Sequence, residues 1–407
     1  MADEDYDSGS YTETSEKGWG ERLGESIKGV AVGGILVIAS IGVLFKNEGC
    51  AVRTAEGLKE VAGLVVTIQP DKIDPANEGK PVTVSGEAST TETLSDNLGF
   101  SANAFKISRN VEMYQWAENK HEKKTKKAGG KEVTETTYTY EKKWSSSAYN
   151  SDNFNKEGKK RAESKEKISI SNPSMAYTSG DPIYAKTASL GAFKLNESII
   201  KRIGSEAKVN LTNEDLAKMS PEIKGKAKIL DGLIFIGKDS GNAQVGDLKI
   251  SFSKIEPKAT ITIRAKQTGN SFSSFVTKNG TSIEEVSMGV KTAQEMDQSA
   301  QDSNTFRTWA LRVIGFIAMA IGISMIFKPL QTMGDVLPIL GDLLGLGINI
   351  FSGIVAFVIS FITIAIAWFF YRPLLSIGLI VVAAAIVVGF KYYKKTQADK
   401  NTQPAKA

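Results

Sequence analysis

The residue types that most often bind metals or carry catalysis are scarce in this chain. Among its 407 residues there is one histidine, His121, and one cysteine, Cys50. His121 stands in the charged run Asn-Lys-His-Glu-Lys, which is typical of a solvated segment. A lone His and a lone Cys cannot supply the four ligands of a structural zinc site, and they cannot assemble a catalytic triad. We therefore predict no metal site and no catalytic residue.

The sequence also lacks the short motifs that bind nucleotides or activate a serine. It contains no G-x-x-x-x-G-K-[ST] loop, no G-x-G-x-x-G motif that opens a helix and no G-x-S-x-G motif. Carboxylates are plentiful, so a hydrolase that uses two of them remains an alternative, although no pair stands out. We interpret the chain as a non-enzyme and expect no cofactor.

The single cysteine limits the disulfide chemistry of the chain. No intramolecular disulfide can form, whereas a disulfide between two chains remains open. Asn47-Glu48-Gly49 precedes Cys50 and lacks the small apolar pattern of a lipoprotein signal.

Four apolar segments are long enough to cross a bilayer as helices. They are residues 27–45, 309–327, 348–371 and 374–390. The first segment would be about 28 Å long at 1.5 Å per residue, which matches the hydrocarbon core. It is followed directly by Lys46 rather than by an Ala-x-Ala-like cleavage site, so we interpret it as an uncleaved anchor. We predict four transmembrane helices.

The charges at the two ends of the chain predict an orientation. Residues 1–26 are acidic and are expected to be a disordered tail, whereas residues 391–407 are rich in Lys. Basic segments stay on the cytoplasmic side, so the C-terminal tail is predicted to be cytoplasmic. Four spans then place the N-terminus on the same side. Residues 46–308 would form an extracytoplasmic domain, in the periplasm of a bacterium or the lumen of a eukaryote.

Residues 328–347, between the second and third spans, contain a short apolar stretch with Pro and Gly breaks. We predict an interfacial or re-entrant segment, with a fifth span as the alternative. Arg312 lies one turn inside the second span and is predicted to reach back to the membrane surface.

The middles of the four spans carry no Asp, Glu, His or Lys, which argues against an ion-coupled transporter. They do carry small residues at four-residue spacing, which let helix backbones approach closely. These are Gly29 and Gly33, Ala318 and Gly322, Ser352, Ala356 and Ser360, and Ala385 and Gly389. The pattern fits packing within one bundle or contacts between subunits.

The segment between the first two spans has the alternating pattern of short β-strands. Candidate strands are residues 64–68, 82–84, 105–116, 133–144, 229–236, 248–255, 259–265, 271–277 and 282–288. Strands 105–116 and 133–144 are predicted to pair as a hairpin, and Asn279-Gly280 predicts a tight turn. Helices are expected at 197–203, 213–219 and 291–307, the last leading into the second span. The fold class is therefore a four-helix membrane region with an inserted α+β, β-rich domain, in which the polar stretch 147–167 is the best candidate linker.

Two Lys-rich segments, residues 120–131 and 156–167, lie within this domain. They could bind anionic lipid headgroups. We favour the alternative, a solvated segment that keeps sheet edges from associating.

Five segments closely resemble a known family. They are Arg-Asn-Val-Glu-Met-Tyr-Gln-Trp at 109–116, Asn-Glu-Gly at 47–49, Val-Gly-Asp-Leu-Lys-Ile-Ser-Phe at 245–252, Thr-Trp-Ala-Leu-Arg at 308–312 and Trp-Phe-Phe-Tyr-Arg-Pro-Leu at 368–374. The chain resembles the transmembrane protein 43 (LUMA) family nearly from end to end. The resemblance implies a membrane organiser without catalytic residues. The family's animal members lie in the endoplasmic reticulum and inner nuclear membrane, self-associate and hold envelope proteins such as emerin and lamins.

We expect a membrane scaffold that self-associates and gathers envelope membrane proteins through its extracytoplasmic domain, without binding nucleic acid. The low cysteine count favours a bacterial member in the inner membrane. The alternative function is an oligomeric channel or channel modulator, for which the only hint is a polar stripe on the third span: Ser352, Ser360 and Thr363.

Overall fold

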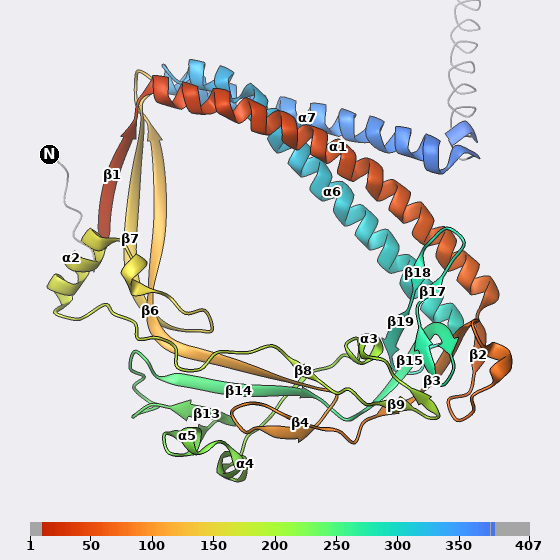
Figure 1. Ribbon diagram of the computed structural model, residues 1–407. Helices are drawn as coiled ribbons and strands as arrows, with labels where there is room; N and C mark the ends of the chain where they lie inside the picture. The colour runs from red at the N-terminus through yellow and green to blue at the C-terminus, as the bar shows by residue number, and fades with distance from the viewer. Residues whose placement is uncertain (1–9, 375, 379–407) are drawn as a thin grey trace, which may run out of the picture. The chain divides into compact units, whose positions relative to one another are not determined.

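The computed structural model describes residues 10–374 and 376–378 (Figure 1). The described chain divides into two units. The β-rich unit holds the chain up to Glu16, Gly57–Thr125 and Glu132–Ser299. The helical unit holds Lys17–Glu56, Lys126–Lys131 and the chain from Ala300 onward.

The β-rich unit is built on two mainly antiparallel sheets. The first has the order β1 (Tyr11–Lys17), β7 (Glu132–Ser145), β6 (Lys106–Lys126), β14 (Leu248–Ile255), β13 (Leu233–Ile236) and β12 (Ala227–Leu230), with β8 (Ile183–Tyr184) on β6 and β11 (Ala207–Lys208) on β14. The second has the order β10 (Phe193–Lys194), β9 (Ser189–Leu190), β3 (Pro81–Ser89), β15 (Lys258–Thr268) and β16 (Ser271–Ser273), with β19 (Glu285–Met288) on β15 and β2 (Val66–Ile68) parallel to β3. Two small ribbons pair β4 (Thr93–Ser95) with β5 (Ser101–Asn103), and β17 (Phe275–Val276) with β18 (Ser282–Ile283).

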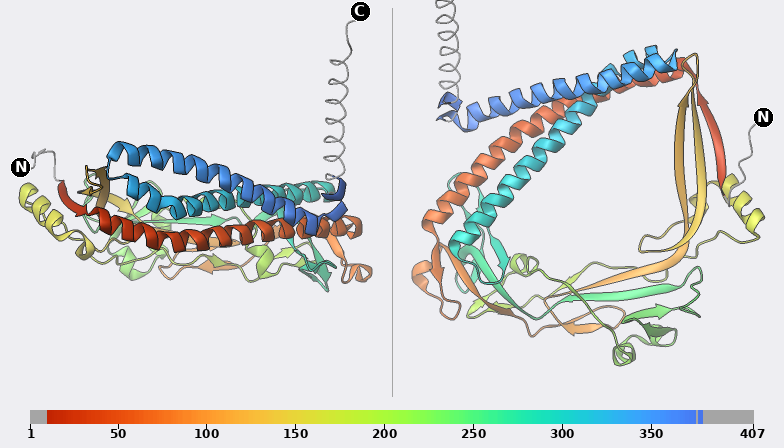
Figure 2. Two further views of the ribbon diagram at one scale, coloured as in Figure 1. Left: turned by 90° about the horizontal axis from the view of Figure 1, so that it is seen from above. Right: turned by 180° about the vertical axis from the view of Figure 1, so that it is seen from behind.

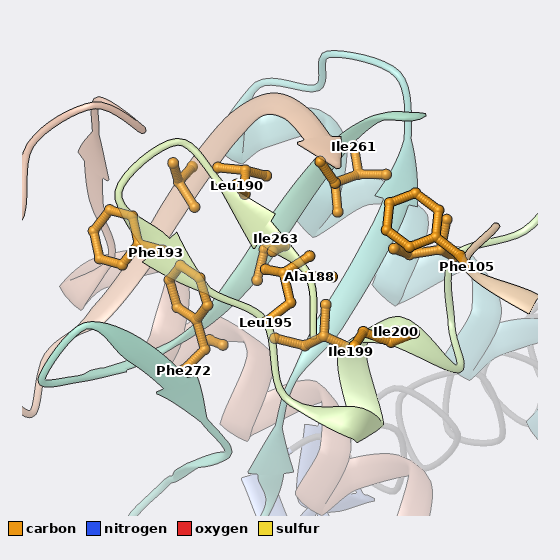
Figure 3. Close-up of a cluster of buried hydrophobic side chains, with 14 of the residues drawn as sticks. Phe105, Ala188, Leu190, Phe193, Leu195, Ile199, Ile200, Ile261, Ile263 and Phe272 are labelled. Atoms are coloured by element: carbon orange, nitrogen blue, oxygen red, sulfur yellow. The ribbon is translucent and has the colours of Figure 1, made fainter. Parts of the chain in front are cut away.

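Each sheet has its own apolar core. Against the second sheet, Phe193 and Phe272 stack with ring centroids 4.9 Å apart, beside Leu190 and Ile263 (Figure 3). Short helix α3 (Glu197–Ile200) contributes the fully buried Ile199 to the same core. Against the first sheet the core contains Val111, Ile250 and Phe252, flanked by α4 (Asn213–Lys218) and α5 (Pro221–Lys224). Burying each such side chain contributes about 1.5–3 kcal/mol, so both sheets are stable platforms.

The strand predictions are confirmed in part, because the predicted strands 229–236, 271–277 and 282–288 are each two separate strands. Strand β14 has the predicted bounds, and β6 and β7 are the predicted hairpin, in which β6 continues ten residues past its predicted end. Asn279-Gly280 joins β17 to β18, with Gly280 at φ 82°. The helix predicted before the second span is the first part of α6 (Ala293–Gly334).

The stretch 147–167 is not a linker. It contains a 3₁₀ turn (Ser151–Asn153) and helix α2 (Lys156–Glu166), which begins at the capping side chain of Asn155. Ala162 of α2 packs with Phe154, Ile170 and Trp116 in a third small core. The apolar contacts are few and widely spaced in a Lys-rich segment, which explains why the sequence pattern did not reveal them. A second 3₁₀ turn lies at Pro75–Asn77.

The prediction of a disordered tail over residues 1–26 is wrong for the described part. Residues 11–17 form β1, and α1 (Trp19–Leu64) begins two residues later. Tyr11 stacks on Tyr138 of β7 at 6.3 Å, and the hydroxyls of Thr12 and Thr137 are hydrogen-bonded at 2.9 Å. The strand is polar because it lies at the edge of a sheet, so its composition resembles that of a solvated tail.

Three described helices are long and apolar enough to cross a membrane: α1, α6 and α7 (Pro338–Tyr371). Each is longer than the predicted span inside it. The segment 328–347 is not a separate element, because α6 continues past Pro329 to Gly334 and α7 starts at Pro338. Proline is tolerated in a first helical turn, so Pro338 begins a helix. Most of the fourth predicted span, 374–390, and the whole basic tail, 391–407, lie outside the described residues.

Within the helical unit α1 and α6 run antiparallel, side by side (Figures 1 and 2). Three contacts show the antiparallel order: Gly33 lies against Gly322, Leu44 against Gly315, and Ala51 against Asn304. A Cβ atom on Gly33 would lie 2.5 Å from the Gly322 carbonyl oxygen, and one on Gly322 would lie 2.9 Å from the Gly33 oxygen. Both glycines are therefore required for this approach of the two backbones.

Candidate functional site

The most distinctive site of the helical unit is a buried carboxylate, Glu48, where α1, α6 and α7 meet. Its side chain is 3% exposed. Arg312 on α6 donates from Nε to Oε1 at 2.7 Å and from Nη2 to Oε2 at 2.8 Å. Trp368 on α7 donates from Nε1 to Oε2 at 2.8 Å. One carboxylate thus receives hydrogen bonds from two other helices.

The neighbours of Glu48 on α1 make matching contacts. Asn47 donates from Nδ2 to the Thr308 carbonyl oxygen at 3.1 Å. Gly49 lies against the ring of Tyr371, and a Cβ atom there would come within 2.5 Å of the ring carbon Cζ. The run Asn-Glu-Gly therefore serves three separate contacts, and each residue type is dictated by its own contact.

Aromatic rings surround the ion pair. The Arg312 guanidinium lies 4.7 Å from the ring centre of Trp309 and 5.9 Å from that of Trp368. The Arg372 guanidinium also lies 5.9 Å from the ring centre of Trp368. Such cation–π contacts add to the hydrogen bonds and shield them from water. The chemistry of the site is therefore that of a fixed ion pair with its bidentate geometry satisfied.

Arg312, which was predicted to reach back to the membrane surface, binds Glu48, and Glu48 lies just after the first apolar segment. Sequence reasoning did not single out Glu48. A signal was available: Glu48 follows an apolar segment directly and Arg312 stands inside another, so each charge needs a partner.

A second polar cluster joins the start of α1 to the turn between α6 and α7. Asp335 is 1% exposed and binds Arg22 through Oδ2 and Lys126 through Oδ1, the latter at 2.8 Å. Arg22 also donates to the Gly130 carbonyl oxygen at 2.6 Å, and Trp19 donates from Nε1 to the Thr332 carbonyl oxygen at 2.8 Å. Burial alone would lower the pKa of Lys126, but the hydrogen bonds that its ammonium donates to the Asp335 and Asp342 carboxylates outweigh this effect and raise that pKa.

Lys126 is the last residue of β6 and Gly130 lies in the turn that follows, and both belong to the Lys-rich segment 120–131. The segment is therefore only partly solvated. Its strand residues Lys120, Lys123 and Lys124 are exposed, while the turn is bonded to helix ends.

The small residues of the described spans pack inside the chain. Gly33 and Gly322 join α1 to α6, while Ser352, Ala356 and Ser360 are buried. Ser360 donates to the sulfur of Met319, and the Thr363 hydroxyl donates to the Ile359 carbonyl oxygen within α7. The polar stripe that suggested a channel is therefore buried within one chain. Ala385 and Gly389 lie outside the described residues.

The remaining candidates stay apart from these clusters. His121 is exposed on β6, and Cys50 is exposed on α1. Over the described residues, no group of three or more His, Cys, Asp or Glu side chains could hold a metal ion.

Comparison with known proteins identifies the chain's relatives. The family model for Transmembrane protein 43 matches residues 113–373. The chain belongs to this family. It is 31% identical to human Transmembrane protein 43 over 374 residues, covering 89% of each chain, and 32% identical to the mouse protein over 378 residues, with the same coverage. The Transmembrane protein 43 homolog of Drosophila melanogaster is 25% identical over 366 residues, which cover 88% of this chain and 93% of the fly protein. No solved structure gives a significant match.

The family assignment confirms the resemblance and, with three apolar helices, an integral membrane protein. Three of the segments that carried the resemblance, 47–49, 308–312 and 368–374, meet at the Glu48 ion pair. Segments more than 250 residues apart in sequence thus serve one site, which sequence spacing alone could not reveal.

Proposed function

We propose that the protein is a membrane scaffold that self-associates and gathers envelope membrane proteins through its β-rich unit. The observation that carries the proposal is the state of the buried charges in the helical unit. Glu48 and Asp335 each receive hydrogen bonds from two other side chains of the same unit. Groups saturated in this way hold helices in place, whereas a transporter or enzyme needs a group that can exchange its partner.

The surfaces of the helical unit support the same proposal. Large apolar side chains point outward on all three helices: for example Ile35 and Ile38 on α1, Ile321 on α6, and Phe357 and Phe361 on α7. An apolar exterior around a fixed interior suits an anchor in lipid and contacts with neighbouring membrane proteins. In a bacterium the site of action would be the inner membrane. In a eukaryote it would be the endoplasmic reticulum and inner nuclear membrane.

The mass of the purified particle in mild detergent tests self-association. We expect more than one chain per particle at micromolar concentration, with dissociation on dilution. A strict monomer at every concentration, in detergent and in lipid nanodiscs, would contradict the proposal. Flux assays on the same preparation in liposomes address the alternative function, because ion conductance would favour a channel.

A further inference from the structure

The chain before α1 belongs to the β-rich unit. β1 is the outer strand beside β7, and its Glu13 carboxylate accepts a hydrogen bond from the Tyr138 hydroxyl at 3.0 Å. The Arg161 guanidinium of α2 lies 5.0 Å from the ring centre of Tyr11. These contacts, together with the Thr12–Thr137 hydrogen bond, fix residues 11–16 within that folded unit.

The chain after the apolar part of α1 returns to the same unit. Leu58 and Val61 are buried there, and a Cβ atom on Gly57 would come within 2.7 Å of the Thr281 side chain. The Glu60 carboxylate accepts a hydrogen bond from the Lys278 backbone N–H. Between these two anchors α1 is one continuous helix that contains the apolar segment 27–45. A helix that crossed the bilayer once would leave its two ends on opposite sides.

Both ends of helix α6 lie next to ion pairs with residues of β-strands. Its first turn lies in the β-rich unit, where Met296 is buried and Asp297 binds Arg264. Its last turn leads to Asp335, which binds Lys126 at the end of β6. Strand β6 starts in the β-rich unit and reaches Lys126 through exposed, charged residues. An open polar hairpin cannot pass through hydrocarbon, because its backbone groups and charges would lose water without replacement.

We propose that α1 and α6 do not cross the bilayer and instead lie within one leaflet. Their partner is the acyl-chain layer of that single leaflet, which covers the outward apolar side chains of both helices. Ile35 and Ile38 of α1 are 69% and 72% exposed, as an embedded surface requires. At 1.5 Å per residue α1 is about 69 Å long, more than twice the hydrocarbon thickness, a length that suits a helix lying along a membrane. The proposal replaces the expectation that residues 1–26 and 46–308 lie on opposite sides.

Single-cysteine labelling in sealed vesicles tests the sidedness. In a Cys50→Ser background, Thr14→Cys reports β1 and Ser101→Cys reports the β-rich unit, since both side chains are exposed. We expect a membrane-impermeant maleimide to label both sites or neither before detergent is added, and both afterwards. Labelling of one site and protection of the other would overturn the proposal.

A disulfide and a depth measurement complete the test. Thr12→Cys with Thr137→Cys, again with Cys50→Ser, should oxidise to a crosslink in native membranes, because these side chains are in contact. Spin labels at Ile27, Ile35 and Val43 should report similar depths within one leaflet. A label at Ile35 near the bilayer midplane, with the other two shallow, would overturn the placement even if the disulfide variant failed to fold.

Discussion

Replacing Arg312 with leucine should destabilise the helical unit strongly. The change removes two of the three hydrogen bonds that Glu48 accepts and leaves a carboxylate that is 3% exposed with Trp368 as its remaining donor. Removing one partner of a buried ion pair typically costs about 3–5 kcal/mol, because the other charge stays buried without compensation.

The double variant separates the ion pair from simple packing. When Glu48→Leu accompanies Arg312→Leu, no charge is left buried, and the main residual cost is an unpaired Trp368 N–H, worth about 1–3 kcal/mol. The two single losses added together would reach about 6–10 kcal/mol. We therefore expect the double variant to be more stable than the Arg312→Leu variant, with a coupling energy of several kcal/mol between the two positions.

The free energy of unfolding can be followed by titration with SDS in mixed micelles, with helix content measured by circular dichroism. Arg307→Leu is the matched control, since Arg307 is exposed about one and a half turns earlier on α6. It should change stability by less than about 0.5 kcal/mol. If Arg312→Leu were no more damaging than Arg307→Leu, or if the two single losses simply added, the ion pair would not hold the helices.

Three further predictions are checked by unfolding experiments. Gly33→Val should separate α1 from α6 and lower the free energy of unfolding by more than about 2 kcal/mol. Gly34→Val is the control and should be nearly neutral, because a Cβ atom at Gly34 meets nothing within 4 Å. Equal losses of stability in the two variants would contradict the packing of α1 on α6. Lys126→Met should lower the unfolding free energy by more than about 1 kcal/mol, because it removes a charged hydrogen-bond donor from the buried Asp335; an unchanged unfolding midpoint would contradict this contact. The pKa of Glu92 lies below its ordinary value of 4.5 because the backbone N–H of Thr187 hydrogen-bonds the carboxylate, against a smaller opposing effect of burial. Because this pKa is lower in the folded state, the ionised Glu92 carboxylate stabilises the fold at pH values above the unfolded pKa, and this contribution is lost as pH falls through the folded-state pKa. The free energy of unfolding should therefore decrease below about pH 4.5. Glu92→Gln should weaken that pH dependence in a urea titration of the β-rich unit.

The parts of the fold that were predictable from the sequence are those with local patterns. Alternation marked β14, and the Asn279-Gly280 pair marked the turn between β17 and β18, because both signals lie within a few residues. β1 was mistaken for a disordered tail because its identity as a strand depends on β7, more than 100 residues away. The Glu48 site was missed for the same reason: a charge at the end of an apolar segment shows that a partner is needed but not which one.

Hydropathy alone does not determine whether α1 crosses the bilayer. Arg22 binds Asp335 just after α6, and Glu48 binds Arg312 on α6. Between Arg22 and Glu48, α1 rises about 39 Å at 1.5 Å per residue, close to the full thickness of a bilayer with its headgroups. Length and composition therefore fit a crossing, and they fit a helix in one leaflet equally well. The two arrangements differ in whether the two ends of α1 lie on opposite sides of the membrane or on the same side.

For α1 to cross the bilayer, the ribbon of β1, β7 and β6 would have to cross as well, because β1 leads directly into α1 and belongs to the same β-rich unit as the residues that follow the apolar part of α1. Lys120, Lys123 and Lys124 are exposed on β6, and each charge at the bilayer centre costs about 2.5–3.5 kcal/mol on insertion scales. Three lysines alone would cost about 8–10 kcal/mol, as much as the whole stability of a typical domain. The open edges of the ribbon would add backbone groups without partners. Neutralising the three lysines with glutamine should therefore leave the sidedness of β1 unchanged if α1 lies in one leaflet. A shift of the Thr14→Cys label to the opposite side would show instead that these charges had prevented a crossing that the rest of the chain permits.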